Sequence, residues 1–172
     1  MVYEEEIEHL EKMPFGHTRN EFILKIVQPA LVGLMDGSVS TLAPIFAAAF
    51  ATGSSHVAFV IGMSAAVGAG ISMGFAEALS DTGTESGRGH PFMRGVIIGF
   101  TTLIGGILHT VPFLISNLHA ALYLAYIIVA IELTAISYIR YHFFRMSFWL
   151  SVVQVVFGGA LVLVAGLLIG SV

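Results

Sequence analysis

The chain contains no cysteine among its 172 residues, and charged side chains are scarce. Without thiolates, disulfides, cysteine-based zinc sites and iron–sulfur clusters are all excluded. Only 10% of the residues are charged, whereas a soluble domain uses about 25% to cover its surface. Hydrophobic residues make up 56% of the sequence, and the mean hydropathy is +0.90. These values predict an integral membrane protein.

The N-terminus lacks the basic residues of a signal peptide, because the chain begins Met-Val-Tyr-Glu-Glu-Glu. We interpret residues 1–26 as a cytosolic acidic tail that ends in the start of the first helix. Within this tail, Glu6 and His9 form one Glu-x-x-His, a spacing used in carboxylate-bridged di-iron bundles. One copy cannot build such a site. The pair is a candidate for cytosolic cation capture, and a solvated acidic helix is the alternative.

Residues 27–172 contain five apolar stretches, which predict an all-α membrane domain with five transmembrane helices. About 20 apolar residues cross the ~30 Å hydrocarbon core of a bilayer. Short connectors between the stretches make successive helices antiparallel neighbours. The stretches are 27–50, 57–79, 93–115, 120–139 and 148–169.

The distribution of basic residues predicts the orientation of the chain. With five spans, every lysine and arginine falls on one side of the membrane, and positive residues favour the cytosolic side. We therefore expect a cytosolic N-terminus and an external C-terminus. The basic residues are Lys12, Arg19, Lys25, Arg88, Arg94, Arg140 and Arg145.

Small residues recur at a spacing of four along several spans, and this pattern predicts a tight helix bundle. Such spacing lets helix backbones approach closely in lipid, within one chain or between two chains of a dimer. The pattern occurs at Gly62, Ala66, Gly70 and Gly74, and in the pairs Gly33/Gly37, Gly95/Gly99 and Gly166/Gly170.

Asp36 lies near the middle of the first apolar stretch. A carboxylate at mid-membrane costs about 3 kcal/mol on insertion scales, so its presence points to an ion or proton site. The alternative is a buried hydrogen-bonding role. Pro44 frees the backbone carbonyl of Ser40 by removing one helical hydrogen bond, so this carbonyl and the hydroxyls of Ser38 and Ser40 are candidate auxiliary oxygen ligands. A packing kink is the alternative for this proline.

The second span offers two further candidates, Met73 and Glu77, which share one helix face because they are four residues apart. Together with Asp36 they form a predicted path that descends from the cytosol toward mid-membrane. Carboxylates bind any divalent cation, whereas a thioether favours softer transition metals over Mg²⁺ or Ca²⁺. The alternatives are a core-filling methionine and an interfacial acid.

Two more titratable residues lie within spans. Glu132, about seven residues from the predicted cytosolic end of the fourth span, is a candidate proton relay or further metal ligand. The alternative is a buried acid paired with a serine, threonine or arginine. His109, deep in the third span, is a candidate for releasing an ion or proton, with a hydrogen-bonded structural histidine as the alternative.

These residues resemble the vacuolar iron transporter family. Asp36-Gly37-Ser38-Val39-Ser40-Thr41-Leu42 is similar to the first-span motif D-G-x-x-S-T of that family, and residues 72–80 resemble its second-span motif S-M-x-x-x-E-x-x-S. Residues 70–80, residues 87–91 and the fifth span look most like the membrane domain of membrane-bound ferritins. The resemblance covers roughly residues 27–170.

The resemblance implies a dimeric, proton-coupled exporter of cytosolic Fe²⁺, with Mn²⁺ as a companion substrate and a path near the interface between first spans. It implies that Asp36 and Met73 are transport-site residues and that Glu77 is a cytosolic-side ligand. Metal ions and protons would be transported, with no permanently bound cofactor. A bacterial or archaeal member would lie in the plasma membrane.

The connector 80–92 is too short for the helical metal-binding insert of eukaryotic members. The resemblance to membrane-bound ferritins makes a ferritin-like iron-collecting domain or protein a candidate partner, besides a second copy and membrane lipid. No nucleophile–base pair or phosphate loop points to an enzyme, and nothing suggests nucleic-acid binding. Two alternatives stay open: a membrane anchor that does not transport, and an uncoupled proton or cation channel.

Overall fold

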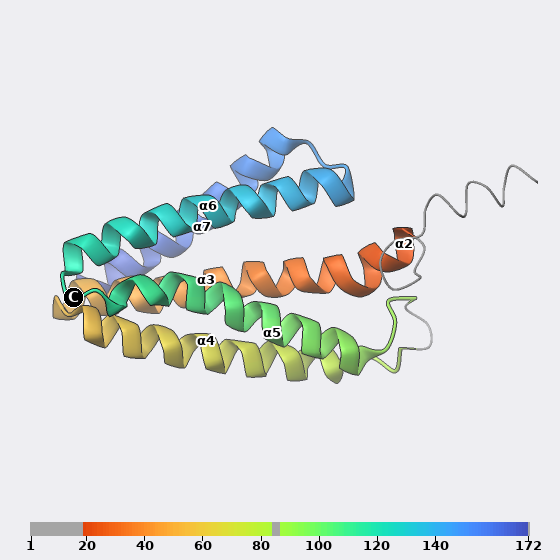
Figure 1. The fold of residues 1–172 in the computed structure, drawn as a ribbon, viewed down its shortest axis with the longest axis horizontal. Coiled ribbons are helices and arrows are strands. Elements are labelled where there is room, and N and C mark those ends of the chain that lie inside the picture. Colours follow the sequence, from red (N-terminus) through yellow and green to blue (C-terminus); the bar gives the residue numbers. More distant parts are fainter. Residues whose placement is uncertain (1–18, 84–86, 172) are drawn as a thin grey trace, which may run out of the picture.

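The computed structural model describes residues 19–83 and 87–171, and every regular element in these ranges is a helix (Figure 1). Glu6 and His9 lie outside the described residues. The elements are α2 (Arg19–Phe22), the π-helix η2 (Ile23–Val27), α3 (Gln28–Thr52), α4 (Ser55–Ala78), α5 (Pro91–Thr110), the 3₁₀-helix η3 (Val111–Leu114), α6 (Leu118–Phe144) and α7 (Phe148–Gly170).

Five helical segments are long and apolar enough to cross a membrane, which confirms the predicted number of spans. They are Arg19–Thr52, Ser55–Ala78, Pro91–Leu114, Leu118–Phe144 and Phe148–Gly170. Two are longer than predicted: the first starts at Arg19 and the fourth ends at Phe144. Hydrophobicity marks the part of a helix that lies in lipid, whereas caps and backbone geometry determine where the helix ends. The fourth span stops at Arg145, whose φ of 54° is left-handed.

Short capped connectors join the spans. Gly53 ends α3 with a φ of 64°, a left-handed conformation that glycine adopts without a steric penalty. The side chain of Ser54 then accepts a hydrogen bond from the Val57 N–H and starts α4, and Asn117 does the same for α6 through the Ala120 N–H. These tight turns hold consecutive helices antiparallel.

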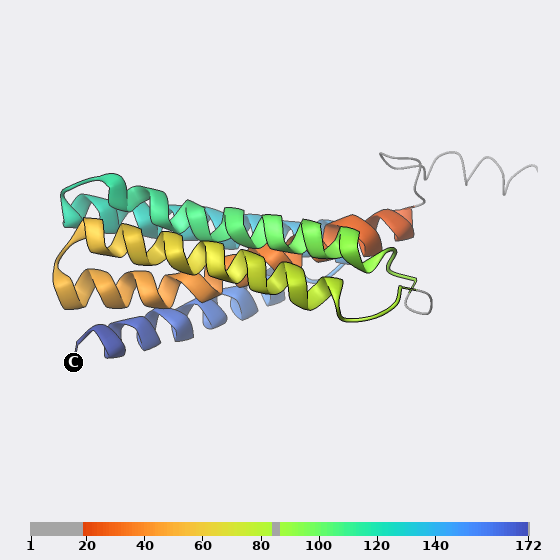
Figure 2. The same ribbon diagram turned by 90° about the horizontal axis from the view of Figure 1, so that it is seen from below.

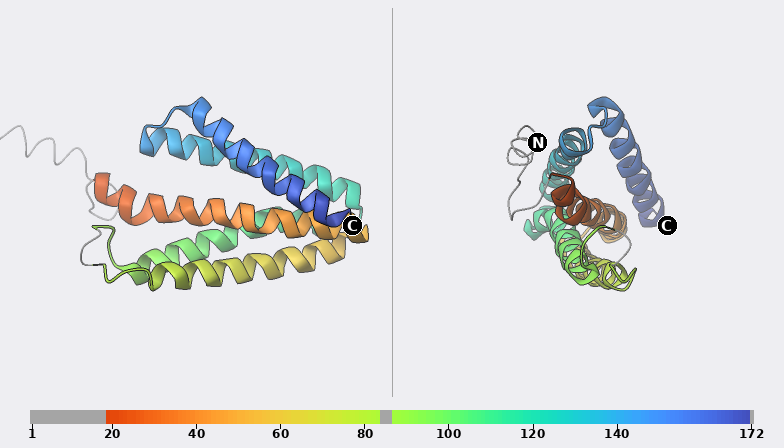
Figure 3. Two further views of the ribbon diagram at one scale, coloured as in Figure 1. Left: turned by 180° about the vertical axis from the view of Figure 1, so that it is seen from behind. Right: turned by 90° about the vertical axis from the view of Figure 1, so that its right-hand side faces the viewer.

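The first span is central to the bundle: α4 and α5 lie on one side of α3, and α6 and α7 lie on the other (Figures 1 and 3). Seen at right angles, α7 crosses α3 obliquely (Figure 2). Near the C-terminus of α7, Gly166 and Gly170 pack on the backbones of Ala43 and Ala47. Further back, Gly159 contacts Leu133 of α6 instead.

Glycines on α4 and α5 bring these two helices into backbone contact. A Cβ added to Gly74 would lie 3.1 Å from the Gly95 carbonyl oxygen, and one on Gly70 would lie 2.9 Å from the Gly99 carbonyl oxygen. Gly37 of α3 likewise faces the backbone of α5 at Thr102. The small-residue pattern is therefore used within one chain, and it gives no separate support for a dimer.

The basic residues of the described ranges gather at one end of the bundle, which we call the basic end. Lys25 packs against Gly89 of the α4–α5 connector, and Phe22 contacts Phe143 near the end of α6. The N-terminal end of the first span and the second and fourth connectors thus lie together. The opposite end, which contains Gly53 and Asn117, is called the far end.

Candidate functional site

Asp36 lies near the middle of the 34-residue first span, on the face of α3 that carries Ala43 and Ala47. Near the far end, Gly166 and Gly170 of α7 pack on this face. Further along α7, Gly159 contacts Leu133 of α6 instead. The Asp36 side chain is half-buried, and within residues 19–83 and 87–171 its carboxylate makes no hydrogen bond or ion pair. The described residues therefore hold a carboxylate near the middle of the span without supplying a partner for it.

Ser40 lies one turn after Asp36, but its hydroxyl donates to the Asp36 backbone carbonyl oxygen at 2.7 Å. Pro44 remains inside α3. The hydroxyl hydrogen of Ser40 is thus used by the helix backbone. The hydroxyl oxygen can still coordinate a cation through its lone pairs. Its role as an auxiliary ligand stays a prediction.

Met73 and Glu77 both lie half-buried on the face of α4 that contains Ala66. Ala66 packs against Gly106 of α5, so this face is directed into the bundle. In the described part of the chain, no three histidine, aspartate or glutamate side chains come close enough to share a metal ion. The predicted path therefore does not form a closed metal site within one protomer.

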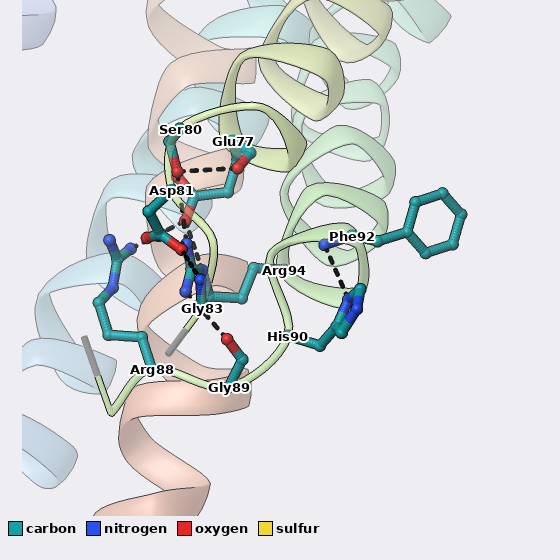
Figure 4. Close-up of polar contacts among 9 residues, drawn as sticks. All are labelled: Glu77, Ser80, Asp81, Gly83, Arg88, Gly89, His90, Phe92 and Arg94. Carbon is teal, nitrogen blue, oxygen red and sulfur yellow. Dashed lines mark hydrogen bonds and ion pairs between the residues drawn. The ribbon is translucent and has the colours of Figure 1, made fainter. Parts of the chain in front are cut away.

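Glu77 belongs to a cluster of charges at the basic end, formed with Asp81, Arg88 and Arg94 (Figure 4). Oε1 of Glu77 lies 2.6 Å from Nε of Arg94 and 3.1 Å from an Nη of Arg88. Another nitrogen of Arg94 lies 2.7 Å from Oδ2 of Asp81. Two guanidinium groups thus face two carboxylates, and the four formal charges cancel.

Arg94 is the fixed member of this basic-end cluster, since its side chain is 1% exposed against 32% for Arg88. It also donates to the Gly89 carbonyl oxygen at 3.2 Å and lies 3.4 Å from the Ser80 hydroxyl. The arginine therefore ties the connector to the ends of α4 and α5.

Asp81 lies in the connector, beyond the end of α4. The hydrogen bond from Arg94 holds the pKa of the Asp81 carboxyl below its ordinary value, and the Gly83 N–H, which donates at 2.7 Å, acts in the same direction. Asp81 thus stays ionised and balances Arg94.

A second cluster lies inside the bundle, where Ser38 of α3, His109 of α5 and Glu132 of α6 meet; we call it the central cluster. The Ser38 hydroxyl lies 2.6 Å from Oε1 of Glu132, and His109 Nε2 lies 2.8 Å from Oε2. The three side chains are 3%, 1% and 5% exposed, respectively.

Gly105 allows the three helices to approach at this point. A Cβ there would lie 2.7 Å from the Leu34 carbonyl oxygen and 3.4 Å from Oε1 of Glu132. Because α6 continues to Phe144, Glu132 lies close to the middle of its helix, deeper than the sequence predicted. The structure thus brings together two candidates that the sequence treated separately and gives Glu132 a serine and a histidine as partners.

Sequence analysis singled out Ser38 only as an auxiliary oxygen ligand beside Asp36, and it did not single out Asp81 or Arg94 as site residues. Arg94 was used there only to predict the orientation of the chain. The glycine pairs of α4 and α5 could have placed it beside Glu77. Pairing Gly70 with Gly99 and Gly74 with Gly95 fixes the antiparallel register of α4 and α5, which places Arg94 beside Glu77. No comparable pattern links Ser38 to Glu132, which is 94 residues away.

Comparison with known proteins identified a family. The model described as the VIT family matches residues 80–171, more than half of the chain. This match covers the third to fifth spans, whereas Asp36, Met73 and Glu77 precede it. No curated protein and no solved structure matches the chain.

Proposed function

Because the chain belongs to the VIT family of membrane metal-ion transporters, we propose that it exports cytosolic Fe²⁺ in exchange for protons, with Mn²⁺ as a companion substrate. The observation that carries this proposal is Asp36, a mid-membrane carboxylate with no protein partner in the described ranges. An uncompensated carboxylate at this depth is costly, and a transported cation or proton offsets that cost.

Glu77 is the proposed entry ligand, followed by Met73 and then by Asp36. Oxygen and thioether ligands in sequence favour Fe²⁺ and Mn²⁺ over Mg²⁺, since sulfur adds nothing to the binding of hard cations. In the structure, Oε1 of Glu77 already contacts two arginines. An entering divalent cation must therefore displace one of them, and Arg88 is the more exposed of the two.

The proposed functional unit is a homodimer in which the first spans face each other. Gly166 and Gly170 of α7 pack on the Asp36 face of α3 toward the far end, and the Asp36 side chain is only half-buried, so part of it is open to a second copy. One protomer offers too few ligands there, since divalent transition metals take about four to six. A second Asp36 and a second Met73 would supply the rest.

Coupling follows from competition between a metal ion and a proton for the same carboxylate. Metal ligands must be deprotonated, so metal binding releases protons and protonation releases metal. With an acidic external side, a returning proton would eject the metal from Asp36. Flux from the cytosol is expected to fall when the cytosolic side is acidified and to rise when the external side is acidified.

The proposed orientation places the basic end in the cytosol, because short loops rich in lysine and arginine remain there. Glu77 then lies at the entrance and the far end at the exit. In a bacterium or archaeon, the membrane would be the plasma membrane.

The test is uptake of Fe²⁺ and Mn²⁺ into proteoliposomes with an imposed pH gradient, read with a metal-sensitive dye and a pH dye. Asp36→Asn should abolish both metal flux and proton counterflux. Met73→Leu should reduce Fe²⁺ flux and leave the fold intact. Glu21→Gln is the matched control, because Glu21 pairs with Lys25 on its own helix and lies outside the proposed path.

Wild-type flux in Asp36→Asn would refute the proposed path. Metal flux that ignores the pH gradient would indicate an uncoupled channel, and absence of flux in the wild type would favour an anchor. Side-by-side assays with Co²⁺, Zn²⁺ and Mg²⁺ would define the selectivity.

A further inference from the structure

The contacts of the central cluster determine how many protons it can hold. Four short contacts run in a row: Leu34 O to Ser38 Oγ at 2.8 Å, Ser38 Oγ to Glu132 Oε1 at 2.6 Å, Glu132 Oε2 to His109 Nε2 at 2.8 Å, and His109 Nδ1 to Gly105 O at 2.8 Å. Each contact is a hydrogen bond only if one hydrogen lies between its two atoms.

The two ends of the row are backbone carbonyls, which only accept hydrogen bonds. At the Gly105 end, the hydrogen must therefore be on Nδ1 of His109, so Nε2 of a neutral ring would be a bare acceptor. At the other end, Ser38 has a single hydrogen, and it can be directed to Leu34 or to Glu132. The serine and the neutral histidine thus supply two hydrogens for four contacts.

With no further proton, the Nε2 lone pair of His109 would face an ionised Glu132 at 2.8 Å. The cluster would be negatively charged and buried, which is a costly arrangement. One added proton makes Glu132 and His109 a neutral ion pair at 2.8 Å, in which Oε2 of Glu132 accepts no hydrogen bond of good geometry. A second, on Oε1 of Glu132, lets Ser38 donate to Leu34 and gives the cluster a net charge of +1.

We propose that Ser38, His109 and Glu132 form a proton-binding site, separate from Asp36, that alternates between one and two protons during transport. This inference rests on the proposed function, since it assigns part of the proton exchange to these residues. The extra proton is bound when no metal is present and leaves when a divalent cation occupies the Asp36 site.

The coupling to Asp36 passes through α3. Ser38 is two residues from Asp36 and on a different face of the helix, so the helix lies between the metal site and the central cluster. Two positive charges on opposite sides of one helix repel each other in a medium of low dielectric constant. Metal binding therefore favours the neutral, singly protonated form of the cluster.

Few other titratable groups lie on the helices around this site. α7 has none, and α3 has only Asp36. The remaining groups of α4 and α5, and the histidines and arginine of α6, lie near helix ends; Tyr126 of α6 is stacked on Phe46. Those near the ends are His56, Glu77, Arg94, His119, Arg140 and His142.

The experiment counts the protons released when Mn²⁺ binds to the purified full-length chain. Calorimetry in two buffers of different ionisation enthalpy gives this number at a fixed pH. Glu132→Gln keeps the size and hydrogen-bonding capacity of the side chain but removes its exchangeable proton. We expect it to bind Mn²⁺ and to release about one proton fewer per ion than the wild type.

Thr134→Ala is the matched control, because Thr134 is an exposed residue of the same helix whose hydroxyl is bound to the Ala130 carbonyl. It should release the wild-type number of protons. An unchanged proton count in Glu132→Gln would overturn the proposed site while leaving metal transport through Asp36 intact. Absence of Mn²⁺ binding in the wild type would instead refute the proposed function.

A second measurement uses the wild type alone and does not depend on folding of the variant. The infrared difference spectrum between the Mn²⁺-free and Mn²⁺-bound protein should show loss of a protonated carboxyl C=O band. Isotopic labelling of glutamate should shift this band, which assigns it to glutamate rather than aspartate. A difference spectrum with no glutamic acid band would also overturn the proposal.

Discussion

The basic-end cluster and the central cluster both hold buried polar side chains between helices, but they balance charge in different ways. Around Arg94, two carboxylates and two guanidiniums form ion pairs whose formal charges cancel. Around Glu132, the carboxylate faces the Ser38 hydroxyl and the His109 ring, with no guanidinium among its described partners. One cluster is balanced by arginines, whereas the charge of the other follows from the proton content that we propose for it.

This difference matches their depths. An arginine cannot be deprotonated in a protein, so it needs fixed counter-charges and lies where the connector can supply them. A histidine and a glutamate can neutralise each other by sharing a proton, which lowers the cost of placing them at mid-membrane. Deleting Glu77, the less exposed of the two carboxylates paired with Arg94, should therefore be more damaging than deleting a partner in the central cluster.

Glu77→Leu is expected to have the largest effect on stability. The substitution leaves the buried guanidinium of Arg94 with one carboxylate fewer, and breaking a buried ion pair from one side costs about 3–5 kcal/mol. Reversible unfolding in mixed detergent micelles would measure this loss. A cost below that of the same substitution at Glu132 would contradict the comparison.

Glu132→Leu is expected to cost less, about 1–3 kcal/mol, because His109 can remain neutral and only hydrogen bonds are lost. The double variant Glu132→Leu/His109→Leu should be no less stable than Glu132→Leu alone, since it removes the unpaired ring as well. The same unfolding assay applies to both. Strictly additive losses would show that the two side chains do not act as a pair.

Ser38→Ala should have a smaller effect, about 0.5–1.5 kcal/mol, which is the usual contribution of one hydrogen bond. Its loss removes the donor that faces Oε1 of Glu132. Thr134→Ala, which removes a hydroxyl exposed to lipid, provides the baseline. Equal stabilities for the two variants would mean that the Ser38–Glu132 contact contributes nothing.

Asp81→Asn should have the smallest effect, and only in a defined pH range. The folded-state pKa of Asp81 is lowered by Arg94, so its contribution is present above the unfolded-state value of about 3.9. That contribution is lost as pH falls through the lower folded-state pKa. Thermal unfolding from neutral to acidic pH should therefore show a shallower acid decline in the variant, and identical profiles would contradict the assignment.

The sequence predicted the features that depend on composition and on position along one helix. Hydropathy gave five spans, and counting residues placed Asp36 near the middle of the first. The sequence did not predict which side chains meet across helices. Ser38, His109 and Glu132 lie on three different helices, and no regular sequence spacing connects them. The path through Asp36, Met73 and Glu77 stays a prediction, because no three carboxylate or imidazole side chains of the described residues come together as a metal site.

The π-helical turn η2 at Ile23–Val27 has a consequence for how the chain can change in length. A π turn holds one residue more than an α turn, so it rotates everything before it by about 100° relative to α3. Deleting one residue of this turn would convert it to α-helix and leave Asp36 and the bundle in register. A domain carried ahead of Arg19 would then face a different direction, and Phe22 would move away from Phe143, so this turn is a point at which evolution or design can re-aim an attached domain.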